Sequence, residues 1–431
     1  MPSITTIPLE ILIHITTYVG LKNPTRLYTD TTTDFGALRL SCKHVEASLF
    51  RTFAQRYFDD VSFNRAESSL RKFVDISKSR LSPYLRHVTI HTEVIPALEV
   101  LPQNLDSDTS DPETDIVADA RYHRRRANQK VFLNTSQDQL MLIDAFRNLS
   151  NLEEVIVLGP PPHIFGYIYG ACFRDEFGIH NVGLQKVIEQ ISNASCVQNV
   201  LFSLGRSGTR LKRLYVDMGY HMCDDALNIP SFMEEAVLPV LNHIEAFDLV
   251  LPSSGDSVVI HSKEQKLHEI ETYYTRKFLL QVSQVKKLCL TRARGAGFYN
   301  WLSGPTSEKH YNGPRGLEPP VSPAFTNLCE LELNDCYGIK TDDFLKIIQK
   351  FSSTMRKLCL YRIGFMMFNL DEWPGFLAQL AQASRHIEEI SLREISVCEN
   401  GYRPGKIMFN NGKDFFYAGS NMEEVLGSLV T

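Results

Sequence analysis

The sequence predicts an α/β protein in which a small helical domain precedes an array of helix–strand units on one parallel sheet. Two observations lead to this prediction. The short pattern apolar-x-x-apolar-x-apolar occurs eight times after residue 66, each time closely preceded by an amphipathic helical stretch. Charged residues beside this pattern alternate in sign from one copy to the next. We therefore expect a helical domain over residues 1–58 and the array over residues 59–431.

The composition is that of a folded protein and excludes several functional classes. The 431 residues are 43% hydrophobic and carry a net charge of -5, with 45 Lys and Arg against 50 Asp and Glu. The apolar fraction is too high for a disordered chain, and the charge balance gives no general attraction to nucleic acid. No apolar stretch reaches the length of about 18 residues that predicts a membrane span. We expect neither nucleic acid nor a membrane as partner.

Cysteine usage and motif content argue against cofactor chemistry. Nine scattered cysteines without a C-x-x-C pair predict reduced thiols, hence a protein of the cytoplasm or nucleus. His87 and His91 lie four residues apart in a predicted strand, where their side chains are about 13 Å apart and cannot share a metal. The sequence has no Walker lysine motif and no complete dinucleotide turn. We predict no metal, no cofactor and no catalytic residue.

Two helices are expected in the N-terminal 58 residues. The first begins near Pro8, which suits the first turn of a helix, and it is apolar on nearly all sides. The second runs from about residue 34 to residue 57 and is amphipathic. Two or three short helices make a poor core for about 50 residues. A partner protein, or the rest of the chain, must therefore complete their burial.

Eight strands are expected in the array. Their three apolar positions are Leu85/Val88/Ile90, Leu152/Val155/Val157, Leu211/Leu214/Val216, Ile244/Phe247/Leu249, Val285/Leu288/Leu290, Leu328/Leu331/Leu333, Met355/Leu358/Leu360 and Ile387/Ile390/Leu392. Amphipathic helical stretches precede them, for example at residues 140–146, 184–191, 344–351 and 376–383.

The charges beside these strands predict their order in the sheet. The residue before each middle apolar position is, in turn, His87, Glu154, Arg213, Ala246, Lys287, Glu330, Lys357 and Glu389. The residue before that is Arg86, Glu153, Lys212, Glu245, Lys286, Cys329, Arg356 and Glu388. Opposite charges on adjacent strands favour pairing, and like charges oppose it. Parallel neighbours in sequence order would bring the alternating charges side by side, so we predict one continuous sheet in that order.

Long insertions are predicted to gather along one edge of the array. Inserts at 91–136, 159–183, 252–263 and 293–325 all follow strands, and such inserts often form a binding face. We expect the acidic half of the first insert to be mobile and the insert around Trp301 to be a long loop. Residues 396–431 are expected to cap the array, with a hairpin turn at Asn411-Gly412.

The helix–strand pattern resembles a leucine-rich repeat array of the α/β horseshoe type. The unit that starts at Leu328 carries the Leu-x-x-Leu-x-Leu-x-x-Cys form that ends at Cys336. The resemblance implies a concave face that displays alternate strand residues to a protein target. The candidate target-binding residues, including one on the insert edge, are Tyr215, Asp217, Asn334, Tyr361, Arg393 and Trp301.

The first 90 residues resemble the F-box proteins of filamentous fungi. Three segments carry the resemblance, Ile7 to Ile15, Ala37 to Phe50 and Asp75 to Val88. It implies a substrate receptor of an SCF cullin-RING ubiquitin ligase, in which the F-box helices dock on the Skp adaptor and the repeat region holds an unknown target protein. The positions that match the adaptor-binding motif are Pro8, Leu9, Ile11, Leu12, Ile15, Leu38, Leu40, Cys42 and Val45. Such a receptor is not itself an enzyme.

A second interpretation remains open from the sequence. The chain would be a leucine-rich-repeat interaction scaffold without a ligase role, and its N-terminal helices would cap its own core. Under this reading the helical hairpin is protected within a stable monomer. Under the F-box reading it presents an apolar surface to the adaptor.

Overall fold

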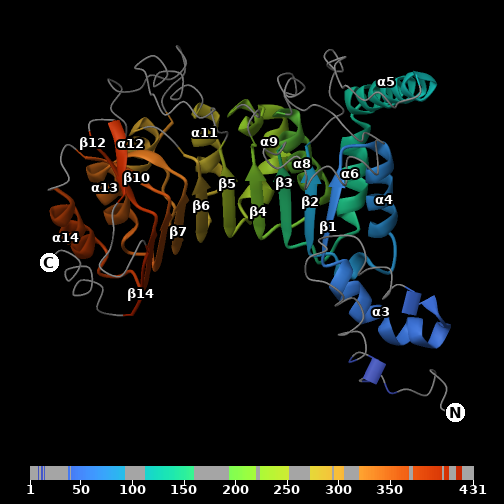
Figure 1. The fold of residues 1–431 in the computed structure, drawn as a ribbon, viewed down its shortest axis with the longest axis horizontal. Helices are drawn as coiled ribbons and strands as arrows, with labels where there is room; N and C mark the ends of the chain where they lie inside the picture. Colours follow the sequence, from blue (N-terminus) through green and yellow to red (C-terminus); the bar gives the residue numbers. More distant parts are fainter. Residues whose placement is uncertain are drawn as a thin grey trace.

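The computed structural model describes residues 8, 11–12, 14, 37–38, 40–92, 112–159, 194–219, 224–251, 272–293, 296–304, 320–367, 372–399, 402–406 and 414–419. These residues form a mixed α/β structure with a large, mostly parallel sheet (Figure 1). The predicted α/β class and its dominant parallel sheet are therefore confirmed.

Ten strands form the main sheet within the described residues. They are β1 (Asp60–Asn64), β2 (His87–His91), β3 (Glu154–Leu158), β4 (Arg213–Asp217), β5 (Ala246–Val250), β6 (Lys287–Thr291), β7 (Glu330–Asn334), β9 (Lys357–Tyr361), β11 (Glu389–Arg393) and β14 (Asp414–Ala418). They lie side by side in that order, and only the last pair, β11 with β14, is antiparallel. All eight predicted strands are present in the predicted order. The sequence analysis missed β1.

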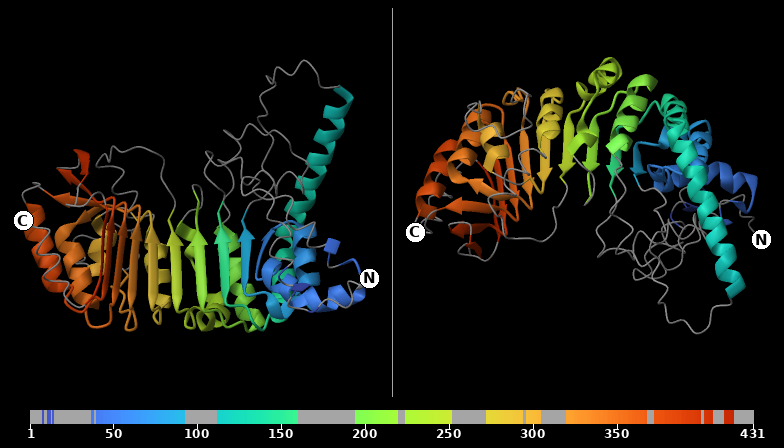
Figure 2. Two further views of the ribbon diagram at one scale, coloured as in Figure 1. Left: turned by 60° about the horizontal axis from the view of Figure 1, so that its bottom comes forward. Right: turned by 90° about the horizontal axis from the view of Figure 1, so that it is seen from above.

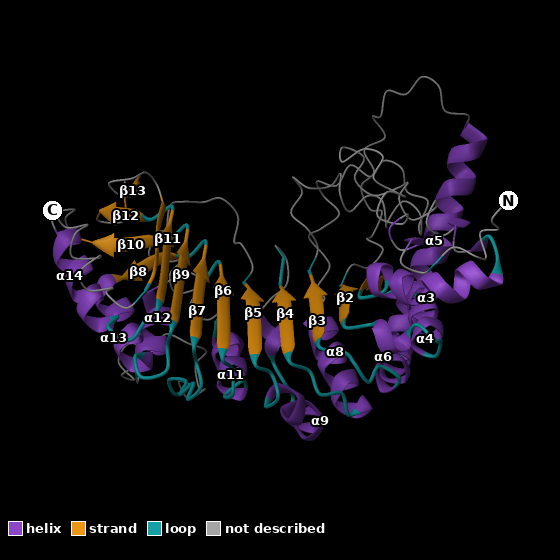
Figure 3. Ribbon diagram, turned by 90° about the horizontal axis from the view of Figure 1, so that it is seen from below, coloured by secondary structure: helices purple, strands orange, loops and turns teal. Residues whose placement is uncertain are grey.

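Helices line one face of this sheet. Figure 3 shows them along the outer side of a curved sheet, and the described residues place no helical layer on the inner side. The helices of the array are α4 (Glu67–Ser77), α5 (Pro112–Asn134), α6 (Gln137–Arg147), α8 (Ala194–Ser207), α9 (Ser231–Leu241), α11 (Tyr273–Gln281), α12 (Ala296–Ser303), α13 (Thr341–Phe351) and α14 (Trp373–Ala383), with short 3-10 turns η2 (Ser82–Tyr84) and η5 (Asp224–Leu227). Helix α3 (Lys43–Tyr57), blue in Figure 2, and helix α14, orange-red, lie at opposite ends of the arc.

Local sequence explains why the units alternate helix and strand. In α13 the apolar residues Phe344, Ile347, Ile348 and Phe351 follow helical spacing and are buried against the sheet. Acidic residues occupy the first turn of this helix and a lysine occupies its last turn, as the helix dipole favours. In the strands, the second and fourth residues are buried under the helices while the first, third and fifth face the inner side. We call this inner side the open face.

Four consecutive strands of the main sheet are each followed by a charged residue with left-handed backbone geometry. Arg292, Asp335, Arg362 and Glu394 follow β6, β7, β9 and β11, with φ angles of 61°, 54°, 55° and 50°. This conformation costs a non-glycine residue roughly 1–2 kcal/mol. Their side chains form successive ion pairs at 3.8 Å, from Arg292 to Asp335, Asp335 to Arg362 and Arg362 to Glu394. We call this row the turn ladder.

A second, smaller sheet follows the turn ladder. It consists of β8 (Tyr337–Lys340), β10 (Gly364–Met367), β12 (Ser396–Glu399) and β13 (Tyr402–Lys406), which sequence analysis did not predict. Close packing here requires a glycine, because a Cβ atom at Gly364 would lie 2.6 Å from Cδ1 of Tyr337. The strands are only four or five residues long, so their sequence pattern is too short to be recognised.

The described residues form two separate hydrophobic cores. The larger core runs through the whole array, from Phe63 to Val397. The smaller one consists of Leu12, Val45 and Leu49, with partly buried Leu38, Cys42, Phe53 and Tyr57 around it. Helix α3 and the described residues before it therefore have a core of their own. We call residues 8–57 the N-terminal helical segment.

Several expectations about individual segments need correction. The predicted helix over 34–57 is not continuous, because Cys42 is extended at φ -158° and α3 begins at Lys43. The first insert, 91–136, contains the long helix α5 instead of a loop, and the insert around Trp301 contains α12. The insert at 159–183 lies outside the described residues beyond Gly159, as do residues 252–263 and the helix expected at 184–191.

The predicted hairpin around Asn411-Gly412 also needs correction. Its first expected arm, residues 407–409, lies outside the described residues. Its second arm belongs to β14, which pairs with β11, whereas the nearest described strand before it, β13, pairs with β12 in the other sheet. Residues 402–418 thus contribute strands to two different sheets.

Candidate functional site

The N-terminal helical segment divides the predicted adaptor-binding residues into two groups. Leu12 and Val45 are fully buried in the small core, and Leu38 and Cys42 pack partly against it. Pro8, Ile11 and Leu40 are exposed, Ile11 by 50% and Leu40 by 69%. The first group supports the fold of the segment, and the second exposes apolar side chains. Leu9 and Ile15 lie outside the described residues.

A narrow seam joins this segment to the array. Glu46 on α3 forms an ion pair with Arg80, which lies between α4 and η2. The Arg80 guanidinium also stacks over the ring of Phe50, 4.0 Å from its centroid, and Phe50 meets Tyr84 edge to face at 6.0 Å. A cation–π contact at an exposed site contributes roughly 0.5–1 kcal/mol. The seam thus orients the segment through a few contacts instead of a shared core.

The charges that predicted the strand order lie at the first residue of each strand and at the residue before it. We call the residues that immediately precede the strands the first charge ladder, and the first residues of the strands the second charge ladder. In the second, Arg213 contacts Glu154 at 3.0 Å, Lys287 contacts Glu330 at 2.9 Å, and Lys357 contacts Glu389 at 2.9 Å. In the first, Lys212 contacts Glu153 at 3.2 Å and Lys286 contacts Glu245 at 3.1 Å. The alternation in the sequence therefore corresponds to ion pairs between neighbouring strands.

Ala246 is an exception in the second ladder, and the structure explains it. Arg213 and Lys287 lie on either side of Ala246 in the register of β4, β5 and β6. Asp248, two residues further along β5, supplies the missing carboxylate and accepts a hydrogen bond of 2.9 Å from Arg213 Nε. The exposed Cys329 is the corresponding exception in the first ladder, between Lys286 and Arg356.

Three of the predicted target-binding residues lie together. Asn334, Tyr361 and Arg393 are the last residues of β7, β9 and β11, and the register places each beside the next. They line a groove of about 440 Å³ on the open face, between β7 and β14. Asn334 donates a 2.9 Å hydrogen bond to Glu332, and the Tyr361 hydroxyl lies 3.5 Å from Glu394.

Tyr215 and Asp217 lie apart from this groove. Both are on β4, which is separated from β7 by β5 and β6. Burial raises the pKa of the Tyr215 hydroxyl, and the nearby carboxylates of Asp217 and Asp248 raise it further. Burial also raises the pKa of Asp217, although its Oδ1 accepts a 2.8 Å hydrogen bond from the Gly219 amide. The predicted target-binding residues therefore do not form one site.

The position of Trp301 differs from the expectation that this residue faces a target. It is fully buried on α12, and its indole N–H donates to the carbonyl oxygens of Pro320 and Val321 at 2.9 and 2.8 Å. Phe298 and Leu302 are buried on the same helix, at the spacing of a helical face. This apolar spacing was the available signal, and the surrounding Gly and Pro residues obscured it.

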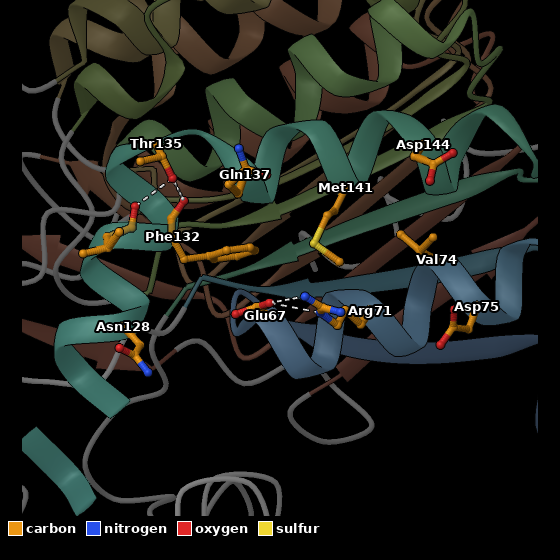
Figure 4. A pocket seen from close by; sticks show the side chains of 11 residues that line it. Glu67, Arg71, Val74, Asp75, Asn128, Phe132, Thr135, Gln137, Met141 and Asp144 are labelled. Carbon is orange, nitrogen blue, oxygen red and sulfur yellow. Dashed lines mark hydrogen bonds and ion pairs between the residues drawn. The ribbon is translucent and has the colours of Figure 1, made fainter. Parts of the chain in front are cut away.

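Sequence analysis missed a second groove on the helical side of the array. It has a volume of about 620 Å³ and lies between α4, the end of α5 and the start of α6 (Figure 4). Val74, Phe132 and Met141 provide apolar surface, and the Glu67–Arg71 ion pair, at 2.5 Å, forms part of its wall. No sequence motif marks this groove, because its residues come from three helices that are separate in the sequence.

A buried ion pair lies behind this region. Arg65 and Asp138 approach to 2.7 Å, and both are almost completely buried. Asn199 lies 3.4 Å from the same carboxylate oxygen, and burial raises the pKa of the neighbouring Cys196 thiol. Such a pair connects β1, α6 and α8, so its role is structural. A neutral, fully buried thiol is not a nucleophile.

Two kinds of feature are absent from the described residues. They contain no group of three or more His, Cys, Asp or Glu side chains placed to hold a metal ion. Among the helices that the structure describes, none has the length and apolar character that crossing a membrane requires. Comparison with known proteins yields neither a matching family model nor a significantly similar curated protein.

Proposed function

We propose that the chain is an F-box substrate receptor of an SCF cullin-RING ubiquitin ligase. Its N-terminal helical segment would bind the Skp adaptor, and its array, a leucine-rich-repeat-like horseshoe, would hold a target protein. The observation that carries the proposal is the exposure of Ile11 and Leu40 beside a core that is separate from that of the array and includes Leu12, Val45 and Leu49. Exposed apolar side chains next to such a core form a surface that a partner can cover.

The geometry of the exposed residues supports an adaptor over a general contact surface. Leu12 and Val45 point into the small core while Ile11, next to Leu12, points outward. Burying apolar area releases roughly 25 cal/mol per Å², so a groove that covers both exposed side chains would stabilise the segment. The array provides the second requirement of a receptor, a curved open face on which the described residues place no helical layer. The receptor would raise the effective concentration of its target near the ligase and would carry out no bond chemistry itself.

Adaptor binding is tested by co-expression with a fungal Skp adaptor and native mass spectrometry. We expect a one-to-one complex with the unmodified chain and its loss in the double variant Ile11→Glu/Leu40→Glu. Phe232→Glu is the matched control, because Phe232 is an 80% exposed apolar residue on α9, outside the N-terminal helical segment. Undiminished adaptor binding by the double variant would rule out this interface.

The interaction scaffold without a ligase role is the second candidate. The seam formed by Glu46, Phe50, Arg80 and Tyr84 favours it, because these contacts hold the segment against the array as an end cap would be held. Hydrogen exchange of the isolated chain separates the two candidates. Protection of α3 equal to that of the array strands, together with no adaptor complex, would favour the scaffold. Rapid exchange of α3 that slows when adaptor is added would favour the receptor.

A further inference from the structure

The groove near the C-terminal end of the open face has a floor of small side chains. Cys359 on β9 and Ser391 on β11 are cross-strand neighbours at the middle of their strands. The equivalent position on β14 is Phe416, which lies opposite Ser391. Burial raises the pKa of Cys359 to about 11, so the thiol is neutral near pH 7. Cys359 and Ser391 are therefore uncharged, and the carboxylate of Glu332 lies beside Cys359 on β7.

One cation at this groove differs from the other cations of the open face. Arg213, Lys287 and Lys357 each have carboxylates within 4 Å. Arg393 is exposed, and the described part of the chain places no carboxylate within 4 Å of it. An unpaired guanidinium can bind a carboxylate through two parallel hydrogen bonds.

Two exposed aromatic side chains lie on either side of Arg393. Tyr361, on the strand before it, is 42% exposed, and Phe416, on the strand after it, is 60% exposed. Both line the same groove. Exposed aromatic residues next to an arginine are typical of the energetically important centre of a protein interface.

We propose that this groove binds an acidic peptide segment of the target, with a carboxylate side chain at Arg393 and an adjacent apolar side chain between Tyr361 and Phe416. The proposal rests on the function proposed above, because it assigns the chemistry of the target to the open face. It differs from that function in requiring no adaptor.

The surrounding charges favour a carboxylate over a phosphate. Glu394 follows Arg393 directly, and Glu332 and Glu389 line the same groove. A dianionic phosphate would approach several of these acids with one available arginine, whereas a single negative charge matches one guanidinium. The net charge of the chain, -5, gives no general attraction to acidic peptides, so any preference for them must be local.

The test uses a displayed library of random heptapeptides and the purified full-length chain. We expect enrichment of heptamers that place Asp or Glu next to an apolar residue. Arg393→Gln should raise the Kd of the best heptamer about tenfold, the size of one lost charged contact. Arg362→Gln is the matched control. It also removes one arginine charge, but from the turn ladder, where Asp335 and Glu394 already pair with Arg362. Its Kd should change less than threefold.

Enrichment without acidic residues would overturn the proposal, and so would equal Kd values for Arg393→Gln and the unmodified chain. A phosphate preference is detected by comparing a phosphoserine with a glutamate at the acidic position of the best heptamer, and tighter binding of the phosphoserine form would also overturn it. The same Arg393→Gln preparation is tested for the Skp adaptor complex and for its melting temperature. Retained adaptor binding with no acidic preference would reject this inference and leave the proposed receptor function intact.

Discussion

The array and the N-terminal helical segment are stabilised in different ways. The array has one continuous core, a ten-stranded sheet in the described residues, and rows of ion pairs between neighbouring strands. Among its described residues, the segment has a core of its own that contains Leu12, Val45 and Leu49, and it leaves Ile11 and Leu40 exposed. The comparison indicates that the two regions are stabilised by separate cores. Changes in one region should therefore have effects distinct from changes in the other.

The largest expected effect is in the array, at the buried ion pair. Arg65→Leu leaves the Asp138 carboxylate buried without its cation, and its Oδ1 already has no hydrogen-bond partner among the described residues. We expect the free energy of unfolding to fall by about 3–5 kcal/mol, as when one partner of a buried pair is removed. Urea unfolding followed by circular dichroism measures this loss.

The matched control replaces both partners with apolar side chains. The double variant Arg65→Met/Asp138→Leu should recover most of the lost stability, because no uncompensated charge remains. If the double variant is as unstable as Arg65→Leu, the loss comes from packing and not from the buried charge.

The second effect is confined to the N-terminal helical segment. Leu49→Ala removes a fully buried side chain from the core of this segment and should cost about 2–5 kcal/mol. We expect α3 to lose protection from hydrogen exchange while the array strands keep theirs. Leu201→Ala on α8 is the matched change in the large core and should lower the stability of the array instead. Simultaneous loss of α3 and array protection in Leu49→Ala would contradict the independence of the two regions.

The third effect concerns pH and lies in the array. Asp224 caps the N-terminus of α11 by accepting hydrogen bonds from the Tyr274 and Thr275 amides at 2.5 and 2.8 Å. Burial raises its pKa from 3.8 to about 7, so the folded state binds a proton that the unfolded state has released above about pH 4. Stability should therefore decrease as pH rises from about 4 to about 7, by on the order of 1–3 kcal/mol from this group.

Asp224→Asn tests this dependence. The amide oxygen can still accept a backbone hydrogen bond, but it does not titrate. Urea unfolding at pH 4.5 and pH 7.5 should show a smaller stability difference in the variant than in the unmodified chain. An identical difference in both proteins would assign the pH dependence to other groups.

The smallest effect completes the first charge ladder. Cys329 lies between Lys286 and Arg356, where the alternation calls for an acid. Cys329→Glu should stabilise the array by roughly 0.2–1 kcal/mol, the usual size of a cross-strand charge pair, and less at high salt. Cys329→Gln is the control, because glutamine has nearly the shape of glutamate without its charge. Thermal unfolding at low and high ionic strength compares the two variants. Equal melting temperatures of the two variants at low salt would mean that the ladder contributes nothing at this position.

The sequence was sufficient to predict the array because its signals are local and repeated. Each of the eight predicted strands carries the same three apolar positions, and the alternation of charge from His87 to Glu389 predicted the order of these strands. The smaller sheet could not be predicted. Its strands Tyr337–Lys340 and Gly364–Met367 are short, and they are recognised as strands only because they pair with each other. Helix α12 was missed because glycines and prolines around it outweighed its apolar spacing.

The candidate site was less predictable than the fold. The sequence placed Asn334, Tyr361 and Arg393 on the open face, but it gave no means of knowing that Phe416 joins them. That neighbour depends on the antiparallel pairing of β14 with β11, which no local pattern encodes. The exposure of Ile11 beside the burial of Leu12 likewise depends on how the helices pack.

The turn ladder has a consequence for how the number of units in this array can change. Its charges alternate, as do those of the second charge ladder, so neighbouring units are not interchangeable. Removing the unit of β9 alone would bring Glu330 beside Glu389 and Asp335 beside Glu394, two repulsive contacts in place of attractive ones.

Removing two successive units has the opposite result. Without β7 and β9, Lys287 would meet Glu389 and Arg292 would meet Glu394, and both ladders would remain attractive. The repeating element of this half of the array is electrostatically a pair of units. Duplication or deletion of an even number of neighbouring units preserves the charge pairing. Duplication or deletion of an odd number of units does not.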